Sequence, residues 1–217
     1  MQKGRGIGFS VPSVLWGLVL AFLLSSPAAA NDKDNLRNLT VAVETISTTA
    51  SGVLIGGGLI LTVSHAAEGQ LNPIVEVAFP NGIVTQGEIV LRMVASDWMV
   101  VRVTPALAPH GAPLDCRKPH MGETVTTLGH PLGNYYTISS GIVASESKTE
   151  TYFYLLSIPI TFGNSGGAVF DADGNVIGLI KGIVSAAYPS GQQFSTGFVT
   201  MISMADICPV LKQRGLM

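Results

Sequence analysis

The chain has 217 residues, with 12 Lys and Arg against 14 Asp and Glu, and it is 47% hydrophobic but only 12% charged. This composition excludes a natively disordered chain, because so much apolar surface can be buried in a core. The low and scattered charge also excludes an electrostatic surface for nucleic acid, so no nucleic-acid partner is expected.

The first thirty residues are organised like a secretory signal peptide. Lys3 and Arg5 precede an uncharged apolar run over residues 14–24, and the small residues SSPAAA follow it. We predict a signal peptide at residues 1–30, cleaved after Ala30. The alternative is an uncleaved membrane anchor, because residues 11–30 have about the twenty-residue length that a span requires. Both alternatives predict export, to the periplasm or the cell exterior, with membrane contact only if the segment is retained.

From Leu39 onward the chain consists of short apolar or β-branched runs separated by turn residues, with no long helical pattern. This arrangement is typical of an all-β fold. A hairpin turn is predicted at the sequence Pro80, Asn81, Gly82. Six strands are expected in this part of the chain, over residues 40–46, 52–55, 59–63, 74–79, 83–92 and 98–103.

Residues 104–120 carry four prolines, which cannot donate hydrogen bonds to a sheet and therefore mark a linker. The linker divides the mature chain into two units, which we place at residues 31–110 and 111–217. Six strands per unit predict two six-stranded antiparallel β-barrels, since closure removes exposed sheet edges. The second unit has expected strands at 123–128, 136–145, 152–158, 168–170, 176–180 and 195–200, a turn at Asp173 and Gly174, and a short C-terminal helix at 202–213.

The two cysteines, Cys116 and Cys208, lie far apart and lack the spacing of a metal site, so neither a metal nor a cofactor is expected. In an exported chain they can form one disulfide. Such a bond would close a loop of about 90 residues and contribute about 4–5 kcal/mol in the chain-entropy description. Two unrelated buried thiols are the alternative.

Ser165 lies between glycines in the sequence FGNSGGAVF. A serine in a glycine-rich turn is either part of an ordinary hairpin connection or a nucleophile, and the segment fits the G-x-S-x-G elbow of α/β-hydrolases. Chain order excludes that fold, because its catalytic histidine follows the serine, whereas the last histidine here is His130. A nucleophilic serine must therefore find its base earlier in the chain, together with a carboxylate that orients the base.

Four histidines are candidates for the base. His110 and His120 fall in the linker and His130 lies in the turn-like sequence LGHPLG, so we interpret these three as surface residues. His65 ends an apolar run and is followed by two alanines, which leave the imidazole room at the rim of a barrel. His65 is therefore the predicted base.

Asp97 and Asp115 are the candidates for the orienting carboxylate, because they lie between His65 and Ser165. Asp115 belongs to the linker. Asp97 precedes the buried-looking sequence WMVVRV, where a carboxylate needs a partner that offsets its desolvation. We favour Asp97, which gives the chain order His65, Asp97, Ser165 of the chymotrypsin type.

With these residues in this order, the chain resembles the trypsin-like serine proteases of the bacterial HtrA/DegP type. The matching segments are SGVLIGGGLILTVSHAAEG, SDWMVVRV, LGHPLG followed by SSGIVAS, and GNSGGAVFDADGNVIGLI. They cover most of the mature chain. The resemblance implies the chymotrypsin fold and protein or peptide substrates, and no PDZ domain is expected after the terminal helix.

The resemblance also assigns roles to residues. Ser165 would attack a peptide carbonyl, His65 would carry the proton and Asp97 would hold His65. The loop of Gly163, Asn164 and Ser165 would form the oxyanion hole through the N–H groups of Gly163 and Ser165. Thr161 and Phe162 depart from the residues usual before this loop in the family.

Specificity is expected to depend on substrate-binding residues beside the loop. By resemblance Ile160 and Ile183 line the pocket for the P1 side chain, although Ile160 can equally be strand core. No acidic residue just precedes Ser165, so small or medium aliphatic P1 residues are expected. Lys181 is an unusual charge in the strand that would pair with substrate. We expect it either to contact acidic or C-terminal groups of a substrate or to point to solvent.

The family's terminal helix packs near the connection between its barrels, so the resemblance implies that Cys116 and Cys208 can pair. The function expected from the sequence is that of an exported serine endopeptidase that forms an acyl-enzyme on Ser165. A noncatalytic peptide-binding protein on a protease scaffold and an esterase with the same three residues are the alternatives.

Overall fold

The structure is a computed structural model that describes residues 35–133, 135–146 and 153–217. The predicted signal peptide, residues 1–30, lies outside the described residues. In the part of the chain that is described, none of the helices combines the length and the apolar character that a membrane span requires.

The first six strands close into an antiparallel barrel with the order β1-β2-β3-β6-β5-β4, in which β1 pairs with both β2 and β4. Alternating side chains point inward, so Val41, Val43, Ile60 and Val101 are fully buried in its core. The predicted turn joins β4 to β5, where Gly82 has a φ of 83° that glycine adopts without strain. The strands are β1 (Thr40–Glu44), β2 (Thr49–Gly56), β3 (Leu59–Thr62), β4 (Ile74–Ala78), β5 (Val84–Met93) and β6 (Trp98–Arg102).

The second six strands close in the same way, with the order β10-β11-β12-β9-β8-β7. Tyr154, Leu156, Ile177 and Met201 are among the buried residues of its core. The strands are β7 (Thr124–Gly129), β8 (Thr137–Ser145), β9 (Tyr154–Ser157), β10 (Ala168–Phe170), β11 (Val176–Ala187) and β12 (Gln193–Ser203). Together with the short terminal helix α2 (Met204–Gln213), these barrels confirm the predicted fold class.

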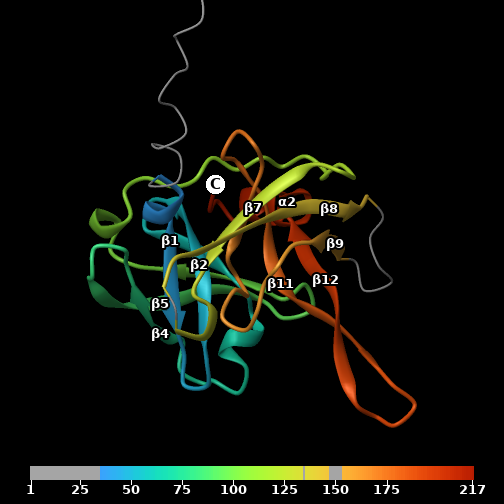
Figure 1. Cartoon of the computed structure of the whole chain (residues 1–217). Helices are drawn as coiled ribbons and strands as arrows, with labels where there is room; N and C mark the ends of the chain where they lie inside the picture. Colours follow the sequence, from blue (N-terminus) through green and yellow to red (C-terminus); the bar gives the residue numbers. More distant parts are fainter. Residues whose placement is uncertain (1–34, 134, 147–152) are drawn as a thin grey trace, which may run out of the picture.

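The two strands β11 and β12 are longer than predicted. The prediction ended the first of them at Ile180. Backbone pairing nevertheless continues to Ala187, opposite Gln193. The distal part of this hairpin projects from the second barrel at the lower right of Figure 1.

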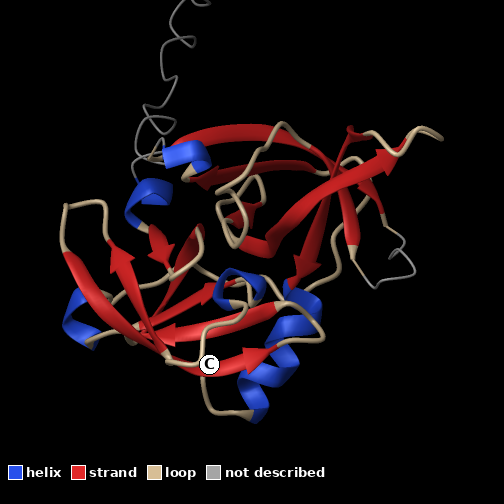
Figure 2. Cartoon of the chain, turned by 90° about the horizontal axis from the view of Figure 1, so that it is seen from below, coloured by secondary structure: helices blue, strands red, loops and turns tan. Residues whose placement is uncertain are grey.

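A third apolar cluster lies between the barrels. It combines residues of the first barrel, such as Trp98 and Leu61, with residues of the second, such as Phe170, and with the buried face of α2. Figure 2 shows the two sets of strands side by side. Because the barrels share this core, the loops at their junction are held in a fixed relation to each other.

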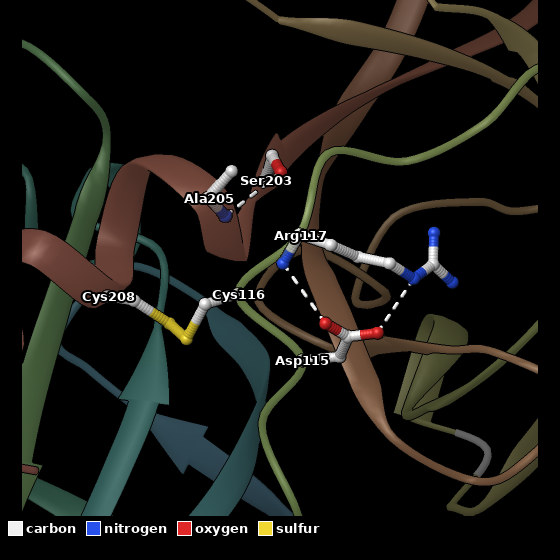
Figure 3. The surroundings of a disulfide bond; sticks show 6 residues. All are labelled: Asp115, Cys116, Arg117, Ser203, Ala205 and Cys208. Carbon is white, nitrogen blue, oxygen red and sulfur yellow. Dashed lines mark hydrogen bonds and ion pairs between the residues drawn. A yellow bond between two sulfur atoms is a disulfide. The ribbon is translucent and has the colours of Figure 1, made fainter.

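Helix α2 begins where Ser203 caps it, with the Ser203 hydroxyl accepting a 3.1 Å hydrogen bond from the Ala205 N–H. A disulfide joins Cys208 of this helix to Cys116 of the linker, as Figure 3 shows, which confirms the pairing that the resemblance implied. Beside it, Arg117 donates to Asp115 at 2.7 Å and also pairs with Glu123. The linker is thus fastened to the second barrel.

Candidate active site

His65 and Asp97 are in direct contact at one end of the first barrel. The Nδ1 atom of His65 lies 2.9 Å from Oδ2 of Asp97, and the His65 backbone N–H donates to Oδ1 at 2.9 Å. The carboxylate therefore holds both the ring and the main chain of the histidine. Its contact with Nδ1 favours the tautomer in which Nδ1 carries the proton and Nε2 is free to accept one.

The position of His65 follows from the end of β3. There the chain turns into a short 3₁₀ helix, His65–Ala67, and the buried Ala66 and Ala67 pack under it. Arg92 on β5 fixes the preceding residue, because its guanidinium donates to the hydroxyl and the carbonyl of Ser64 at 3.0 and 3.1 Å. The His65 side chain is 41% exposed, so its ring is open to a substrate.

Asp97 occupies a left-handed backbone conformation, with φ of 59°, directly before β6. Asp tolerates this conformation better than most residues. Burial raises the pKa of the Asp97 carboxyl, but hydrogen bonds and charge from His65, with a contribution from Lys181, outweigh burial and hold the pKa below its ordinary value. Asp97 therefore stays ionised at neutral pH.

The loop before β10 carries Ser165 and depends on two glycines with positive φ. Gly163 has φ of 97° and Gly166 has φ of 83°. A Cβ atom on Gly163 would lie 2.3 Å from the carbonyl oxygen of His130, and one on Gly166 would lie 2.2 Å from that of Ser51. Both the torsions and the space therefore require glycine.

The amides of this loop differ in their hydrogen bonds. The Asn164 N–H donates to the carbonyl of Thr161 at 3.2 Å, so it is already engaged. Among the residues that the structure describes, the N–H groups of Gly163 and Ser165 have no hydrogen-bond partner. These two amides are therefore the ones that remain available to an oxygen atom of a substrate.

A chain of contacts through Lys181 connects Ser165 to the first barrel. The Ser165 hydroxyl donates to the main-chain carbonyl of Lys181 at 3.0 Å. The ammonium group of the same lysine lies 3.5 Å from Oδ2 of Asp97. No hydrogen bond joins the Ser165 hydroxyl to His65 within the described ranges. Lys181 contacts Ser165 through its carbonyl oxygen and Asp97 through its ammonium group, and Asp97 in turn contacts His65.

Lys181 thus points toward Asp97, and its ammonium also lies 4.6 Å from the ring centre of Phe153. Asp97 is a partner that neither expectation for Lys181 named, since the alternatives were a contact with acidic or C-terminal groups of a substrate and a position in solvent. Ile160 and Ile183 line a pocket of about 270 Å³ beside the loop. The pocket walls also include Ser157, Ile158, Pro159, Ser195, Gly197, Phe198 and Val199.

The other three histidines differ in their burial. His110 and His120 are exposed, as predicted, but the prediction of a surface position for His130 is wrong, because it is only 1% exposed. Its ring packs edge-on against Tyr135 and Tyr136, two aromatic residues that follow the turn. Burial lowers the pKa of His130 to about 4, so the ring is neutral.

Sequence reasoning missed Ser51 on β2. Its hydroxyl donates to the carbonyl of Gly163 at 2.8 Å and accepts the backbone N–H of His130 at 3.0 Å. A buried serine in a strand gives no local signal of such a role, because both partners are distant in the sequence. The alternative carboxylate, Asp115, pairs with Arg117 and is not part of this site.

Comparison with known proteins identifies the family of this chain. The protein-family model described as trypsin-like peptidase domain matches residues 50–179, a range that contains His65, Asp97 and Ser165. The chain belongs to the trypsin-like peptidase domain family. Ile160, in the pocket wall, and Gly163, in the loop before β10, also fall within the matched range.

Named relatives of this trypsin-like peptidase domain are proteases. A probable periplasmic serine endoprotease DegP-like of Halomonas elongata is 29% identical over 172 residues, which cover 76% of this chain and 35% of that protein. The magnetosome formation protease MamE of Magnetospirillum gryphiswaldense is 31% identical, over 77% of this chain and 22% of that protein. The chain thus spans about a third or less of the length of these relatives.

A solved structure gives the same fold for this trypsin-like peptidase domain. The crystal structure of a serine endoprotease from Yersinia pestis superposes with a TM-score of 0.70 at 24% identity. The match covers 87% of this chain and 67% of that one.

Proposed function

We propose that this chain is an exported serine endopeptidase that hydrolyses peptide bonds through an acyl-enzyme on Ser165. The observation that carries the proposal is the contact chain from the Ser165 hydroxyl through Lys181 and Asp97 to His65. This chain of contacts supports a site in which Ser165 is the nucleophile, Asp97 the carboxylate and His65 the base. The protease names of the relatives support the same activity.

The reaction begins when the Ser165 oxygen attacks the peptide carbonyl carbon and its proton passes to Nε2 of His65. The carbonyl oxygen becomes an oxyanion, and the Asp97 carboxylate stabilises the imidazolium that forms. The intermediate collapses when His65 gives the proton to the leaving amine and the C–N bond breaks. Water then attacks the acyl-enzyme by the same proton transfers, which releases the acid and restores Ser165.

The hydroxyl of Ser165 must change its acceptor before this step. A rotation about χ1 moves a serine hydroxyl among three staggered positions, so it can leave the Lys181 carbonyl and turn to His65. Catalytic hydrogen bonds are often long or misaligned without substrate and tighten when substrate binds. We infer that the contact with Lys181 belongs to the resting enzyme.

The amides of Gly163 and Ser165 are proposed to bind the oxyanion. Each donor of this kind typically stabilises a transition state by about 3–4 kcal/mol. Their lack of other partners in the described parts of the chain supports this role. The Asn164 N–H already donates to the Thr161 carbonyl. Asn164 is therefore proposed to be part of the loop without donating to the oxyanion.

The pocket between Ile160 and Ile183 is proposed to receive the P1 side chain. Its walls are largely apolar and contain no charged residue among those that line it. The apolar side chains of Ile160, Ile183 and Phe198 in these walls favour an aliphatic side chain at P1. Since an unpaired charge in such a pocket is costly, Lys or Arg at P1 is disfavoured.

We also propose export to the periplasm. The basic and apolar N-terminal sequence supports it, and so does the word periplasmic in the name of the Halomonas elongata relative. Residues 1–30 would be the signal peptide. Mass spectrometry tests this by identifying the first residue of the protein recovered from a periplasmic fraction.

A peptide-library cleavage profile of the mature protein tests the function, with Ser165→Ala as the control. We expect cleavage after Ala, Val or Ile by the wild type and none by S165A. Ile160→Ala should shift the profile toward larger aliphatic residues, whereas Ile83→Ala, at an exposed position between β4 and β5, should not. Binding of peptides without cleavage would assign a noncatalytic binding protein, and hydrolysis of esters alone would assign an esterase.

A further inference from the structure

We propose that Lys181 is a positioning residue of this site, whose ammonium group holds the Asp97 carboxylate and sets the pH at which the pair of His65 and Asp97 takes up a proton. The inference rests on the proposed function, because it concerns the histidine that accepts the proton of Ser165. It adds a positive charge, the ammonium group of Lys181, beside the residues of the predicted triad.

The geometry places three donors around one carboxylate. Oδ2 of Asp97 lies 2.9 Å from Nδ1 of His65 and 3.5 Å from Nζ of Lys181, while Oδ1 accepts the His65 backbone N–H at 2.9 Å. The Asp97 side chain is only 13% exposed, so water replaces few of these contacts. Lys181 is therefore the cationic partner of a poorly solvated carboxylate whose other contacts are with His65.

The lysine is itself held in place. Its ammonium lies over the Phe153 ring at 4.6 Å from the centroid, an arrangement in which the ring face attracts a cation. Its side chain is 31% exposed, and its main-chain carbonyl accepts the hydroxyl of Ser165. Because Lys181 lies on β11 and Asp97 precedes β6, the ion pair crosses from one barrel to the other.

Two other titratable groups in this part of the site, His65 and Arg92, belong to the first barrel. His65 follows β3, and Arg92 on β5 donates to Ser64, the neighbour of His65. Arg92 keeps its charge throughout the working pH range, so it does not change between acidic and neutral solution. Lys181 is therefore the cation that contacts the Asp97 carboxylate. Its charge can be removed by substitution without disturbing the anchoring of His65.

The electrostatic consequence has a definite sign. His65 shares a hydrogen bond with the Asp97 carboxylate, so a charge beside that carboxylate acts on both groups. A cation beside the pair opposes the addition of a proton, and removing it makes protonation easier. Loss of the Lys181 charge should therefore move the acid limb of the reaction to higher pH, by about one pH unit for a charge at this distance.

The experiment measures the rate at which a fluorophosphonate labels Ser165 as a function of pH. The variants are Lys181→Met, Lys181→Gln and Lys181→Arg, with Lys212→Met as a control that removes an exposed lysine of α2. We expect the midpoint of the acid limb to rise by about one unit in K181M and K181Q and to stay at the wild-type value in K181R and K212M. Two neutral variants of different shape keep the test decisive if one of them folds poorly.

A uniform loss of rate in K181M and K181Q with an unmoved midpoint would overturn this proposal and leave the proposed function intact. So would a midpoint that falls. If the folded wild type is not labelled at any pH, the proposed function fails and this proposal fails with it. Labelling of the wild type that is absent from S165A separates the two cases.

Discussion

The backbone N–H of Ser51 donates a 2.8 Å hydrogen bond to the carbonyl oxygen of Ser165. Ser51 belongs to the first barrel and Ser165 to the loop before β10 in the second, so this bond holds the predicted nucleophile against the barrel that carries His65. The Ser51 hydroxyl strengthens the link, because it also joins Gly163 to His130.

Ser51→Ala keeps the backbone bond but removes the hydroxyl that pairs with Gly163 and His130. Buried polar groups that lose a partner cost about 1–3 kcal/mol each, so we expect a lower free energy of unfolding together with a lower kcat/KM. Denaturant unfolding and peptide hydrolysis measure the two effects. Ser47→Ala, at an exposed position between β1 and β2, is the matched control and should change neither. A fully active and equally stable S51A protein would contradict the role of this serine.

Gly163→Ala should inactivate the loop. The added Cβ would lie 2.3 Å from the His130 carbonyl at a φ of 97°, so the loop must move and its amides turn away from the substrate oxygen. We expect kcat/KM to fall by about 10²–10³, as for the loss of an oxyanion donor. Gly174→Ala is the control, because Gly174 also has a positive φ but open space around it. Equal kcat/KM values for the two variants would refute the argument.

The strands were predictable from sequence because short β-branched runs between turn residues leave few other folds. The contact of His65 with Asp97 follows from their positions, shortly after β3 and directly before β6. The roles of these residues remain predictions. The burial of His130 was not predictable, since its local sequence resembles a turn and its covering partners, such as Ser51, are distant in the chain. The side-chain direction of Lys181 likewise depends on packing between the barrels.

The buried His130 makes a pH-dependent contribution to stability. Its pKa of about 4 lies below the ordinary value of 6.5, so between these pH values the unfolded chain binds the proton more readily than the folded one. The free energy of unfolding should therefore decrease as pH falls from about 6.5 to about 4, by up to about 3 kcal/mol. Above that window the contribution is fully present.

Denaturant unfolding at several pH values measures this dependence. His130→Gln cannot take up the proton and should flatten the slope, whatever its effect on absolute stability. His120→Gln, at an exposed position, should keep the wild-type slope. An unchanged slope in H130Q would show that other groups carry the dependence.

The disulfide between Cys116 and Cys208 should stabilise the fold without acting on the chemistry. It joins residues 92 positions apart, so replacing both with alanine should lower the free energy of unfolding by about 2–5 kcal/mol. The bond fastens the linker to α2, away from His65 and Ser165, so activity per folded molecule should persist. Unfolding curves and active-site titration of the double variant check both statements; a stability equal to that of the wild type would count against the first.

Ser165 is proposed to be a nucleophile that His65 activates. The most direct test of this proposal is fluorophosphonate labelling of the mature protein at neutral pH, with the adduct located by mass spectrometry. We predict one adduct on Ser165 in the wild type, none in Ser165→Ala and a severe loss of labelling in folded His65→Ala. A well-folded wild-type protein that stays unlabelled, or an adduct that forms equally without His65, would contradict it.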